Sequence, residues 1–434
     1  MAQCDDELWW DHLRNARWFQ GKGLPFHGMR IEALPWWNDS SDVWVRSELA
    51  TVQVGDSSSV YHLLVGYCPA GEGESGAVVG RMDFPGRGMV DVLDVPRSPM
   101  AMRALLTSLV AGRESGSSGE EPPDSRPVPI TWFETPPDPD SLTRVFEGEQ
   151  SNTTVLIGEA VLFKIFRKLS PGPNLECEVM AALASSDIIP RLIGTLSAPG
   201  EPYDLGIFCQ RIPDAQDGWA YAVSACQTGV TVADEMRQLG RTLQGLHAEL
   251  AEVFPTSTID SVVISDQMLA RLDAACDQLP ELRAHRSDLR TILTLPPSQI
   301  PIQRIHGDFH LGQALISPAG WTIIDFEGEP LKTPEERCAP DSVWRDVAGL
   351  LRSLNYARST HPDPESFEAR GWYDQARTGF LDGYLSSGPL PSALLTAYEV
   401  DKAIYELVYE VRNRPTWADI PRHALKTALS SSLA

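Results

Sequence analysis

The chain has 434 residues, of which 42% are hydrophobic and 22% charged, and this composition predicts a soluble globular protein of two or three domains. Its formal net charge of −23 argues against nucleic acid and anionic membrane surfaces as main partners, because both require a basic face. No apolar run approaches the roughly 20 residues that a membrane-spanning helix needs, so we expect no membrane as a partner.

Residues 1–110 are predicted to form a small β-rich domain. Short β-prone segments occur at residues 43–45, 51–54 and 61–65, and apolar side chains recur at helical spacing over residues 100–109. The first residues are acidic and lack both the basic head and the apolar stretch of a secretory signal. We therefore expect a cytoplasmic protein.

Residues 111–212 are predicted to form a second β-rich region that contains one helix. A run rich in glycine, serine and proline at residues 114–127 buries little and is expected to be a flexible loop. Two β-prone arms at residues 155–157 and 161–166, joined by a Gly-Glu pair, predict a hairpin. Residues 174–183 are predicted to follow as a helix.

Residues 213–434 are predicted to be mostly helical, most clearly at residues 232–250 and 398–411. Short strands at residues 302–305 and 321–325 are expected to flank a loop. A β-rich lobe with one helix, followed by a helical lobe that carries a small hairpin, is the order of elements in bilobal kinases. The expected fold class is therefore α+β, a bilobal protein-kinase-like fold preceded by an N-terminal β-rich domain.

The most informative sequence is H-G-D-F-H-L-G-Q at residues 306–313, which is followed by a D-F-E sequence. Phosphoryl transfer from ATP needs a carboxylate that accepts the hydroxyl proton, and a second carboxylate with an amide oxygen to bind magnesium. Asp308 has the position of the base, and Gln313 and Asp325 have those of metal ligands. Glu327, which stands where kinases have glycine, is a further candidate metal ligand. A plain turn and a strand-end cap are the alternative. The spacing of the two motifs, with a β-prone run between them, favours the kinase interpretation.

These motifs belong to a longer set of segments that resembles the actinobacterial maltokinases. The likeness runs from about residue 17 to about residue 424, and it includes Q-S-N-T at 150–153, L-F-K at 162–164, D-G-W at 217–219, D-F-E-G-E-P at 325–330, R-D-V-A-G-L-L-R-S at 345–353 and Y-E-V-R-N-R-P at 409–415. The resemblance implies an aminoglycoside-phosphotransferase-like fold with an N-terminal cap domain. It also implies transfer of phosphate from ATP to the anomeric hydroxyl of maltose, which gives maltose 1-phosphate for α-glucan synthesis.

The resemblance also assigns residues that bind the nucleotide. Lys164 takes the place of the kinase lysine that pairs with ATP phosphates, and Glu178 on the next helix is expected to hold it, with Glu176 as the alternative. The loop that covers the phosphates lacks the usual glycines, so polar side chains and backbone N–H groups would supply the donors. An ordinary polar turn is the alternative. The loop residues assigned in this way are Gln150, Ser151, Asn152 and Thr153.

The acceptor sugar is expected to bind at the last long helix, because carboxylates, arginines and aromatic rings suit sugar hydroxyls and ring faces. Two tyrosines of this helix share one face with an asparagine, which a plain core seam would not favour. The alternative is an amphipathic helix packed by its tyrosines. The candidate contacts are Tyr405, Glu406, Tyr409, Arg412 and Trp417.

Two features near the catalytic motif have less certain roles. His310 either contacts the substrate or braces the catalytic loop. Arg345 and Asp346 are expected to form a structural ion pair, as they do in the kinases that this chain resembles.

The sequence leaves other acceptor molecules and a non-enzyme function as alternatives. Glucosamine or another amino compound is the main alternative acceptor, although the related glucosamine kinases tend to read D-F-D-G-N-P where this chain has D-F-E-G-E-P. A catalytically inactive kinase fold is the non-enzyme alternative. It is disfavoured because the lysine, the base and the metal ligands are all in place. We expect a monomer that acts on a small-molecule sugar.

Overall fold

The structure is a computed structural model that describes residues 2–39, 42–115, 130–147, 151–329, 332–385 and 388–432. It divides into two compact units, one made of residues 1–184 and 190–213 and the other of residues 185–189 and 214–434. The predicted cap domain and nucleotide-binding lobe together form the first unit. Of the predicted flexible loop, residues 116–127 lie outside the described residues, and Ser115 ends a helix.

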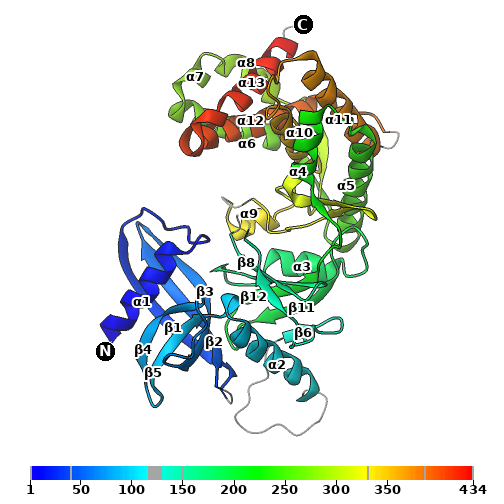
Figure 1. The fold of residues 1–434 in the computed structure, drawn as a ribbon. Coiled ribbons are helices and arrows are strands. Elements are labelled where there is room, and N and C mark those ends of the chain that lie inside the picture. Colours follow the sequence, from blue (N-terminus) through cyan, green and yellow to red (C-terminus); the bar gives the residue numbers. More distant parts are fainter. Residues whose placement is uncertain are drawn as a thin grey trace. The chain divides into compact units, whose positions relative to one another are not determined.

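The first unit begins with helix α1 (Ala2–Asn15) and an antiparallel sheet of order β1-β2-β3-β5-β4, in which α1 packs on β1 and β4 (Figure 1). The core between them is aromatic and aliphatic, and it includes Trp9, Leu13 and Tyr61, each at most 4% exposed. The strands are β1 (Phe26–Asn38), β2 (Trp44–Val54), β3 (Ser57–Pro69), β4 (Val78–Phe84) and β5 (Gly88–Asp94).

A second antiparallel sheet of the same unit has the order β6-β11-β12-β9-β8-β7. Its strands are β6 (Ile130–Trp132), β7 (Thr143–Val145), β8 (Thr153–Ile157), β9 (Val161–Ile165), β11 (Leu192–Ser197) and β12 (Asp204–Gln210). Strands β8 and β9 form the predicted hairpin, and Gly158 in its turn has φ 58°, a left-handed conformation that glycine adopts without strain. Helix α3 (Leu175–Ala182) packs against β11.

Two elements join these sheets. Helix α2 (Pro99–Ser115), which follows the short helix η1 (Val95–Arg97), packs against β1 and β2 of the first sheet and against β6 and β7 of the second (Figure 1). Directly after β9, the chain pairs β10 (Lys168–Leu169) with β3. The strand that carries Lys164 is therefore continuous, within a few residues, with the sheet of the N-terminal domain.

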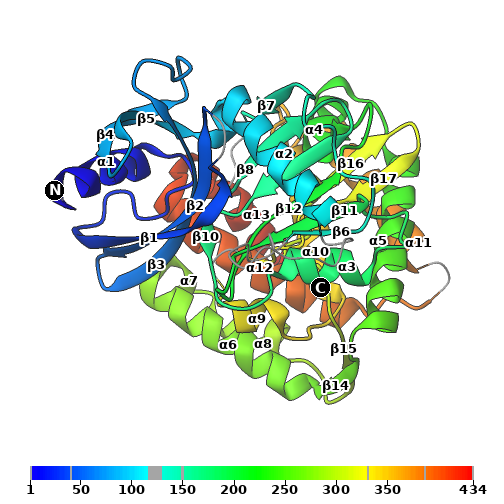
Figure 2. The same cartoon turned by 90° about the horizontal axis from the view of Figure 1, so that it is seen from below.

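The second unit is mainly helical. Helices α5 and α11 run side by side in Figures 1 and 2, and three glycines make this possible. A Cβ atom on Gly240, Gly379 or Gly383 would collide with backbone of the facing helix. The helices are α4 (Gly218–Thr228), α5 (Ala233–Val253), α6 (Ser261–Gln278), α7 (Pro280–Arg283), α8 (Arg286–Leu293), α9 (Pro334–Cys338), α10 (Trp344–Arg358), α11 (Phe367–Leu385), α12 (Ser392–Asn413) and α13 (Asp419–Ser432), with η2 (Leu311–Gln313) and η3 (Pro415–Trp417).

The small strands of this unit differ from the prediction in one respect. The first strand was expected at residues 302–305, but β15 (Gln299–Ile302) ends there and pairs with β14 (Ser257–Asp260). The strand before Asp325 is β17 (Gly320–Ile323), and its partner is β16 (Ala314–Ser317), which in turn pairs with β13 (Gln216–Asp217). The catalytic hairpin therefore lies after the H-G-D motif. No helix among the described residues is long and apolar enough to cross a membrane.

Candidate active site

In the first unit, Lys164 is fixed on β9 between the fully buried side chains of Phe163 and Ile165. Its Nζ atom donates a hydrogen bond to Oε2 of Glu176 over 2.7 Å, and both side chains are largely buried. A lysine held in this way has few rotamers left. Its ammonium group is therefore preorganised for an anionic ligand.

The predicted partner of Lys164, Glu178, was the wrong glutamate of α3, since the structure pairs Lys164 with Glu176 and leaves Glu178 exposed to solvent. Asn174 caps the helix by accepting hydrogen bonds from the next turn, and this fixes where the helix begins. Glu176 then shares a face with the buried Val179 and Met180 at i+3 and i+4. That apolar spacing was visible in the sequence and identifies the inward-facing glutamate.

The predicted phosphate loop connects β7 to β8, and Gln150 lies outside the described residues. Ser151 is exposed. Oδ1 of Asn152 accepts a hydrogen bond from the backbone N–H of Arg167 at 3.0 Å, and Oγ1 of Thr153 accepts one from Nε of the same arginine at 2.8 Å. In the hairpin, Thr153 is opposite Ile165, so the end of the loop adjoins the strand that carries the lysine. The assignment of these residues to a nucleotide stays a prediction.

In the second unit, a buried carboxylate supports the catalytic loop. Asp346 accepts hydrogen bonds from the backbone N–H groups of His306 at 2.8 Å and Gly307 at 2.9 Å, and from Nε2 of His247 at 3.0 Å. Burial alone would raise the pKa of Asp346, but the hydrogen bond and charge of His247, with the Gly307 N–H, hold it below the ordinary value. The turn before Asp308 is thereby held from within the core.

The predicted ion pair between Arg345 and Asp346 was wrong. Arg345 instead contacts Glu329 at 2.6 Å and Asp341 at 3.3 Å, because adjacent residues of a helix point in different directions. Helix α10 also comes close to the catalytic loop. A Cβ atom on Gly349 would lie 2.5 Å from the carbonyl oxygen of Phe309.

Asp325 is held next to the catalytic loop from two sides. Nε2 of Gln313 donates to Oδ2 of Asp325 at 2.9 Å, and the backbone N–H of Ile324 donates to the carbonyl of Gln313 at 3.0 Å. His306 hydrogen-bonds the Ile324 carbonyl through Nε2 at 3.0 Å. Asp325 itself has φ 66°, a left-handed conformation that is strained for a residue other than glycine. Such strain is concentrated at functional positions.

His310 lies near both predicted catalytic carboxylates. Burial lowers its pKa, the negative charge of Asp308 and, to a smaller degree, that of Asp325 oppose this effect, and nearby cations reinforce it. Its Nδ1 atom accepts a hydrogen bond from the backbone N–H of Gly312 at 3.1 Å. Of the two roles considered for His310, the structure supports the bracing of the loop. Contact with a substrate stays a prediction. Glu327 lies half-buried in the turn after Asp325, and its carbonyl oxygen accepts a hydrogen bond from Arg337.

Lys402 of α12 was not among the predicted site residues. Its Nζ atom lies 3.4 Å from Oδ1 of Asp308 and 3.1 Å from Oε1 of Glu329. Burial alone would lower the pKa of Lys402, but Asp308 and Glu329 raise it above its ordinary value. Burial would raise the pKa of Glu329, yet Lys402 and Arg345 lower it to about 2. The available signal was helical spacing, since Lys402 lies three residues before Tyr405 on the face chosen for the acceptor.

The candidate acceptor residues divide into two groups. Tyr405 lies near Asp308, the predicted base, because its ring is 5.5 Å from Nζ of Lys402, which contacts Asp308. Burial raises its pKa to about 12, with a contribution from Glu329. Glu406, one residue further, is bound by Arg352 at 2.7 Å.

The other candidates lie further along the chain. Tyr409 is 40% exposed, and its ring lies 5.6 Å from the guanidinium carbon of Arg414. Arg412 is ten residues beyond Lys402, about 15 Å along the helix axis. Its Nη2 atom donates to Gln278 of α6 at 2.6 Å. Trp417 stacks on Tyr356 with 6.0 Å between ring centroids. The structure therefore brings Tyr405 to Asp308 and gives Arg412 and Trp417 other contacts.

Comparisons with known proteins agree with the predicted fold. The family model described as "Phosphotransferase enzyme family" matches residues 143–382, and the one described as "Maltokinase N-terminal cap domain" matches residues 12–97. A solved structure of a glucosamine kinase in complex with glucosamine, ADP and inorganic phosphate has a TM-score of 0.66 at 21% identity, covering 97% of this chain and 98% of that one. The predicted α+β kinase-like fold with its N-terminal β-rich domain, and the resemblance on which it was based, are confirmed.

Two curated relatives are also glucosamine kinases. The protein from Streptacidiphilus jiangxiensis is 28% identical over 321 residues, which cover 66% of this chain and 73% of the relative. The protein from Mycolicibacterium smegmatis (strain ATCC 700084 / mc(2)155) is 27% identical over 311 residues, which cover 65% of this chain and 78% of the relative.

Proposed function

Because this chain belongs to the phosphotransferase enzyme family, we propose that it is an ATP-dependent sugar kinase that phosphorylates maltose at the anomeric hydroxyl. The observation that carries the proposal is the arrangement around His310, where Asp308 is paired with Lys402 and Asp325 is paired with Gln313. A match to the maltokinase cap domain supports maltose. The names of the curated relatives support the alternative acceptor, glucosamine.

The nucleotide would be bound by groups that the fold holds rigidly. Lys164, oriented by Glu176, would pair with phosphate oxygens. The carboxylate of Asp325 and the amide oxygen of Gln313 are hard oxygen ligands of the kind that magnesium prefers. The two side chains are neighbours, since Nε2 of Gln313 lies 2.9 Å from Oδ2 of Asp325. When bound, magnesium would neutralise charge on the phosphates. Glu327, two residues after Asp325, would be a further ligand.

Asp308 would act as the base. As the sugar oxygen bonds to the terminal phosphorus of ATP, its proton passes to the Asp308 carboxylate and the bond to the ADP oxygen breaks. Lys402 would keep Asp308 oriented, since its ammonium group bridges this carboxylate and that of Glu329. Asp346 would hold the backbone of the same loop.

The charges near Asp308 favour a neutral sugar. The Asp308 carboxylate is paired with the ammonium group of Lys402 over 3.4 Å, so it would attract the ammonium group of an amino sugar less strongly. The two nearby carboxylates are engaged, Glu329 by Lys402 and Arg345, and Glu406 by Arg352. Tyr405, beside Lys402, offers a ring for the sugar's apolar face.

A coupled ATP-consumption assay tests the proposal with maltose, glucose, glucosamine and an aminoglycoside as acceptors. We expect the highest kcat/KM with maltose, and phosphorus NMR of the product should show an anomeric phosphate ester. Asp308→Asn is the matched control for background hydrolysis. A higher kcat/KM with glucosamine would change the assigned acceptor but leave the kinase assignment in place. ATP binding without turnover on any of these sugars would contradict the enzyme assignment in favour of a binding module.

A further inference from the structure

Each ring nitrogen of the buried His247 makes a hydrogen bond to a different helix. His247 lies on α5 and is only 4% exposed. Its Nδ1 atom is 2.8 Å from the hydroxyl oxygen of Tyr384 on α11, and its Nε2 atom is 3.0 Å from Oδ2 of Asp346 on α10. Because Asp346 in turn accepts hydrogen bonds from the catalytic loop, these side chains form a continuous path from α11 to that loop.

The protons along this path have a defined direction at Asp346. Burial would raise the pKa of Asp346, but His247 helps to hold it below the ordinary value, so the carboxylate is charged and only accepts hydrogen bonds. Nε2 of His247 therefore carries the proton that it shares with Asp346. Burial and the negative charge of Asp346 raise the pKa of Tyr384, so its hydroxyl keeps its proton. A hydroxyl both donates and accepts, which lets Tyr384 pair with Nδ1 in either protonation state of the ring.

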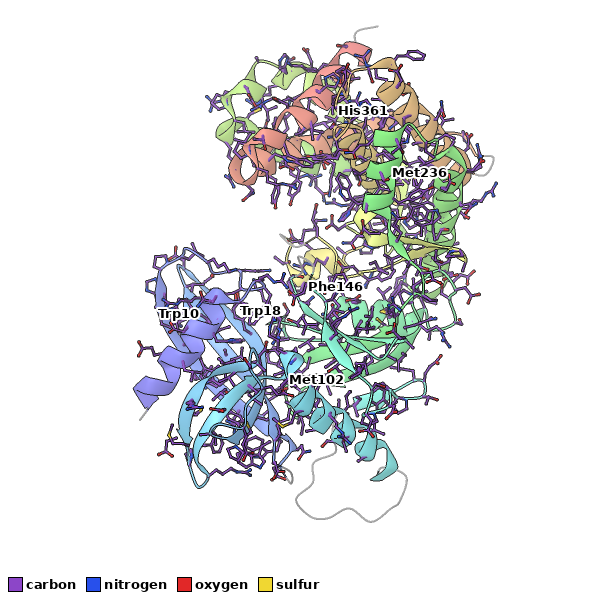
Figure 3. The ribbon with its side chains drawn as sticks, viewed as in Figure 1. Trp10, Trp18, Met102, Phe146, Met236 and His361 are labelled. Carbon is purple, nitrogen blue, oxygen red and sulfur yellow. The ribbon has the colours of Figure 1, made fainter. Side chains whose placement is uncertain are left out.

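Close contact between α5 and α11 brings Tyr384 to His247. A Cβ atom on Gly240 of α5 would lie 2.7 Å from the backbone nitrogen of Tyr384. His247 is seven residues, or about two turns, beyond Gly240 on the same buried face of α5. The buried face begins with Met236, which Figure 3 labels. The hydrogen bond between Tyr384 and His247 therefore lies within the contact between the two helices.

The two rings are also held by other groups of the second unit. The Tyr384 ring meets Trp344 edge-on, with 5.5 Å between the ring centroids, and Trp344 is in the first turn of α10, two residues before Asp346. The backbone carbonyl oxygen of His247 accepts a hydrogen bond from Nε2 of Gln303 at 2.6 Å. Gln303 is in the segment that leads into the catalytic loop. Both α10 and this segment are thereby tied to the pair of His247 and Tyr384.

We propose that His247 is a positioning residue for the catalytic base, and that Tyr384 fixes the orientation of its ring. This role rests on the proposed function, because it acts through Asp346 on the loop that carries Asp308. The His247 N–H restrains rotation of the Asp346 carboxylate, whose two oxygens accept hydrogen bonds from the backbone of the loop. One of these backbone donors is Gly307, the residue directly before Asp308, so rotation of the carboxylate would displace the base.

Steady-state kinetics of His247→Leu and His247→Gln test the role. Leucine removes both hydrogen bonds of the ring. Glutamine keeps a donor for Asp346, because its amide nitrogen is as many bonds from Cβ as Nε2 of histidine is. We expect His247→Leu to lower kcat about tenfold, since a hydrogen bond to a charged group is typically worth that much, and His247→Gln to lower it less than threefold. The KM for ATP should stay within about twofold in both variants, because Lys164 is not on this path.

Tyr384→Phe removes only the hydroxyl group and should lower kcat about threefold, because a hydrogen bond between uncharged groups is worth less than one to a charged group. Tyr373→Phe is its matched control on the same helix, since the Tyr373 hydroxyl accepts from Nη1 of Arg377 at 3.4 Å instead. This control should leave kcat unchanged. The double variant His247→Leu/Tyr384→Phe should be no slower than His247→Leu, because the hydroxyl acts only through the ring.

Proton NMR of the full chain measures the path without any turnover. The Nε2 proton of His247 is buried and bonded to a carboxylate, so it should give a downfield imidazole signal that exchanges slowly with water. We expect this signal in the unmodified chain and in Tyr373→Phe, and a displaced signal in Tyr384→Phe. Its loss in His247→Gln identifies it. If circular dichroism shows that His247→Leu does not fold, Tyr384→Phe and its control decide.

The outcomes separate this role from the proposed function. If the unmodified chain transfers phosphate to none of the sugars, the proposed function fails and the positioning role fails with it. If the unmodified chain is active but folded His247→Leu keeps its kcat, or His247→Gln is as slow as His247→Leu, the kinase assignment stands and the positioning role alone is overturned. The same conclusion follows if Tyr384→Phe has the kcat of its control, or if the downfield signal is absent from the unmodified chain.

Discussion

The catalytic loop of the second unit and the phosphate loop of the first are stabilised in different ways. A buried carboxylate, Asp346, holds the first through two hydrogen bonds from its backbone N–H groups, and a third, from His247 of α5, anchors Asp346 itself. The second borders a cavity, and its ends are bound by arginines, of which Arg17 and Arg97 are about half exposed. The loop that carries the proposed base is thus fixed by the core, whereas the loop that is proposed to cover the nucleotide is held partly by solvent-exposed contacts. Damage to the two loops should therefore change different kinetic constants.

The largest effect is expected for Asp308→Asn. Loss of the base should lower kcat by about 10² to 10⁴, because general base catalysis typically contributes that much. The KM for ATP should stay within twofold, because Asp308 is not among the groups proposed to bind the nucleotide. Steady-state kinetics with both substrates varied would show the difference. If the Asp308→Asn variant had a kcat near that of the unmodified chain, the assignment of Asp308 as the base would be wrong.

Asp346→Ala should have the next largest effect, on stability rather than on a single step. It leaves two buried N–H groups and a histidine without their acceptor, which should cost about 3 kcal/mol of the free energy of unfolding. Urea unfolding followed by tryptophan fluorescence measures this loss. Arg97→Ala, at the other loop, should cost less than about 1 kcal/mol. Equal losses from the two variants would contradict the contrast between a core-held and a solvent-held loop.

The ion network around Lys402 should give the second unit an acid-sensitive component. The pKa of Glu329 is about 2 in the folded chain, below its ordinary 4.5, so its contribution is complete above pH 4.5 and declines as the pH falls toward 2. The difference in unfolding free energy between the unmodified chain and Glu329→Gln should shrink by about 1.4 kcal/mol from pH 6 to pH 3.5. Urea titrations at both pH values test this. A difference that grows on acidification would show the opposite sign of the pKa shift.

The sequence predicted those parts of the molecule whose signal is local. The hairpin of Lys164, helices α2, α3, α5 and α12, and the carboxylates Asp308 and Asp325 all follow from patterns contained within a short stretch of chain. Lys402 was missed because it meets Asp308 across 94 positions of sequence, and a lysine on a helix ordinarily faces solvent.

The partners of Arg345 were missed for a related reason. Adjacent charges in the sequence suggested a pair, but helix geometry sends Arg345 and Asp346 to different sides. The contacts of Arg167 with β3 depend on how the two sheets pack together. The residue pattern of neither sheet alone predicts that packing. Long-range polar contacts of this kind can be identified only from the structure.

The smallest effect is expected for Glu178→Gln, and it is informative because Glu176→Gln is its matched counterpart two residues away. Glu176 holds the Lys164 ammonium at 2.7 Å in a largely buried pair, whereas Glu178 is exposed. Removing the charge of Glu176 should therefore weaken ATP binding about tenfold, since it releases a buried ammonium group. Removal of the Glu178 charge should change binding by less than twofold. Both changes keep side-chain size and helix propensity, so a calorimetric titration compares the charges alone. If Glu178→Gln gave the larger loss, the helix would orient its other face toward the nucleotide, and the rigid ammonium group that the first unit is proposed to supply would need another support.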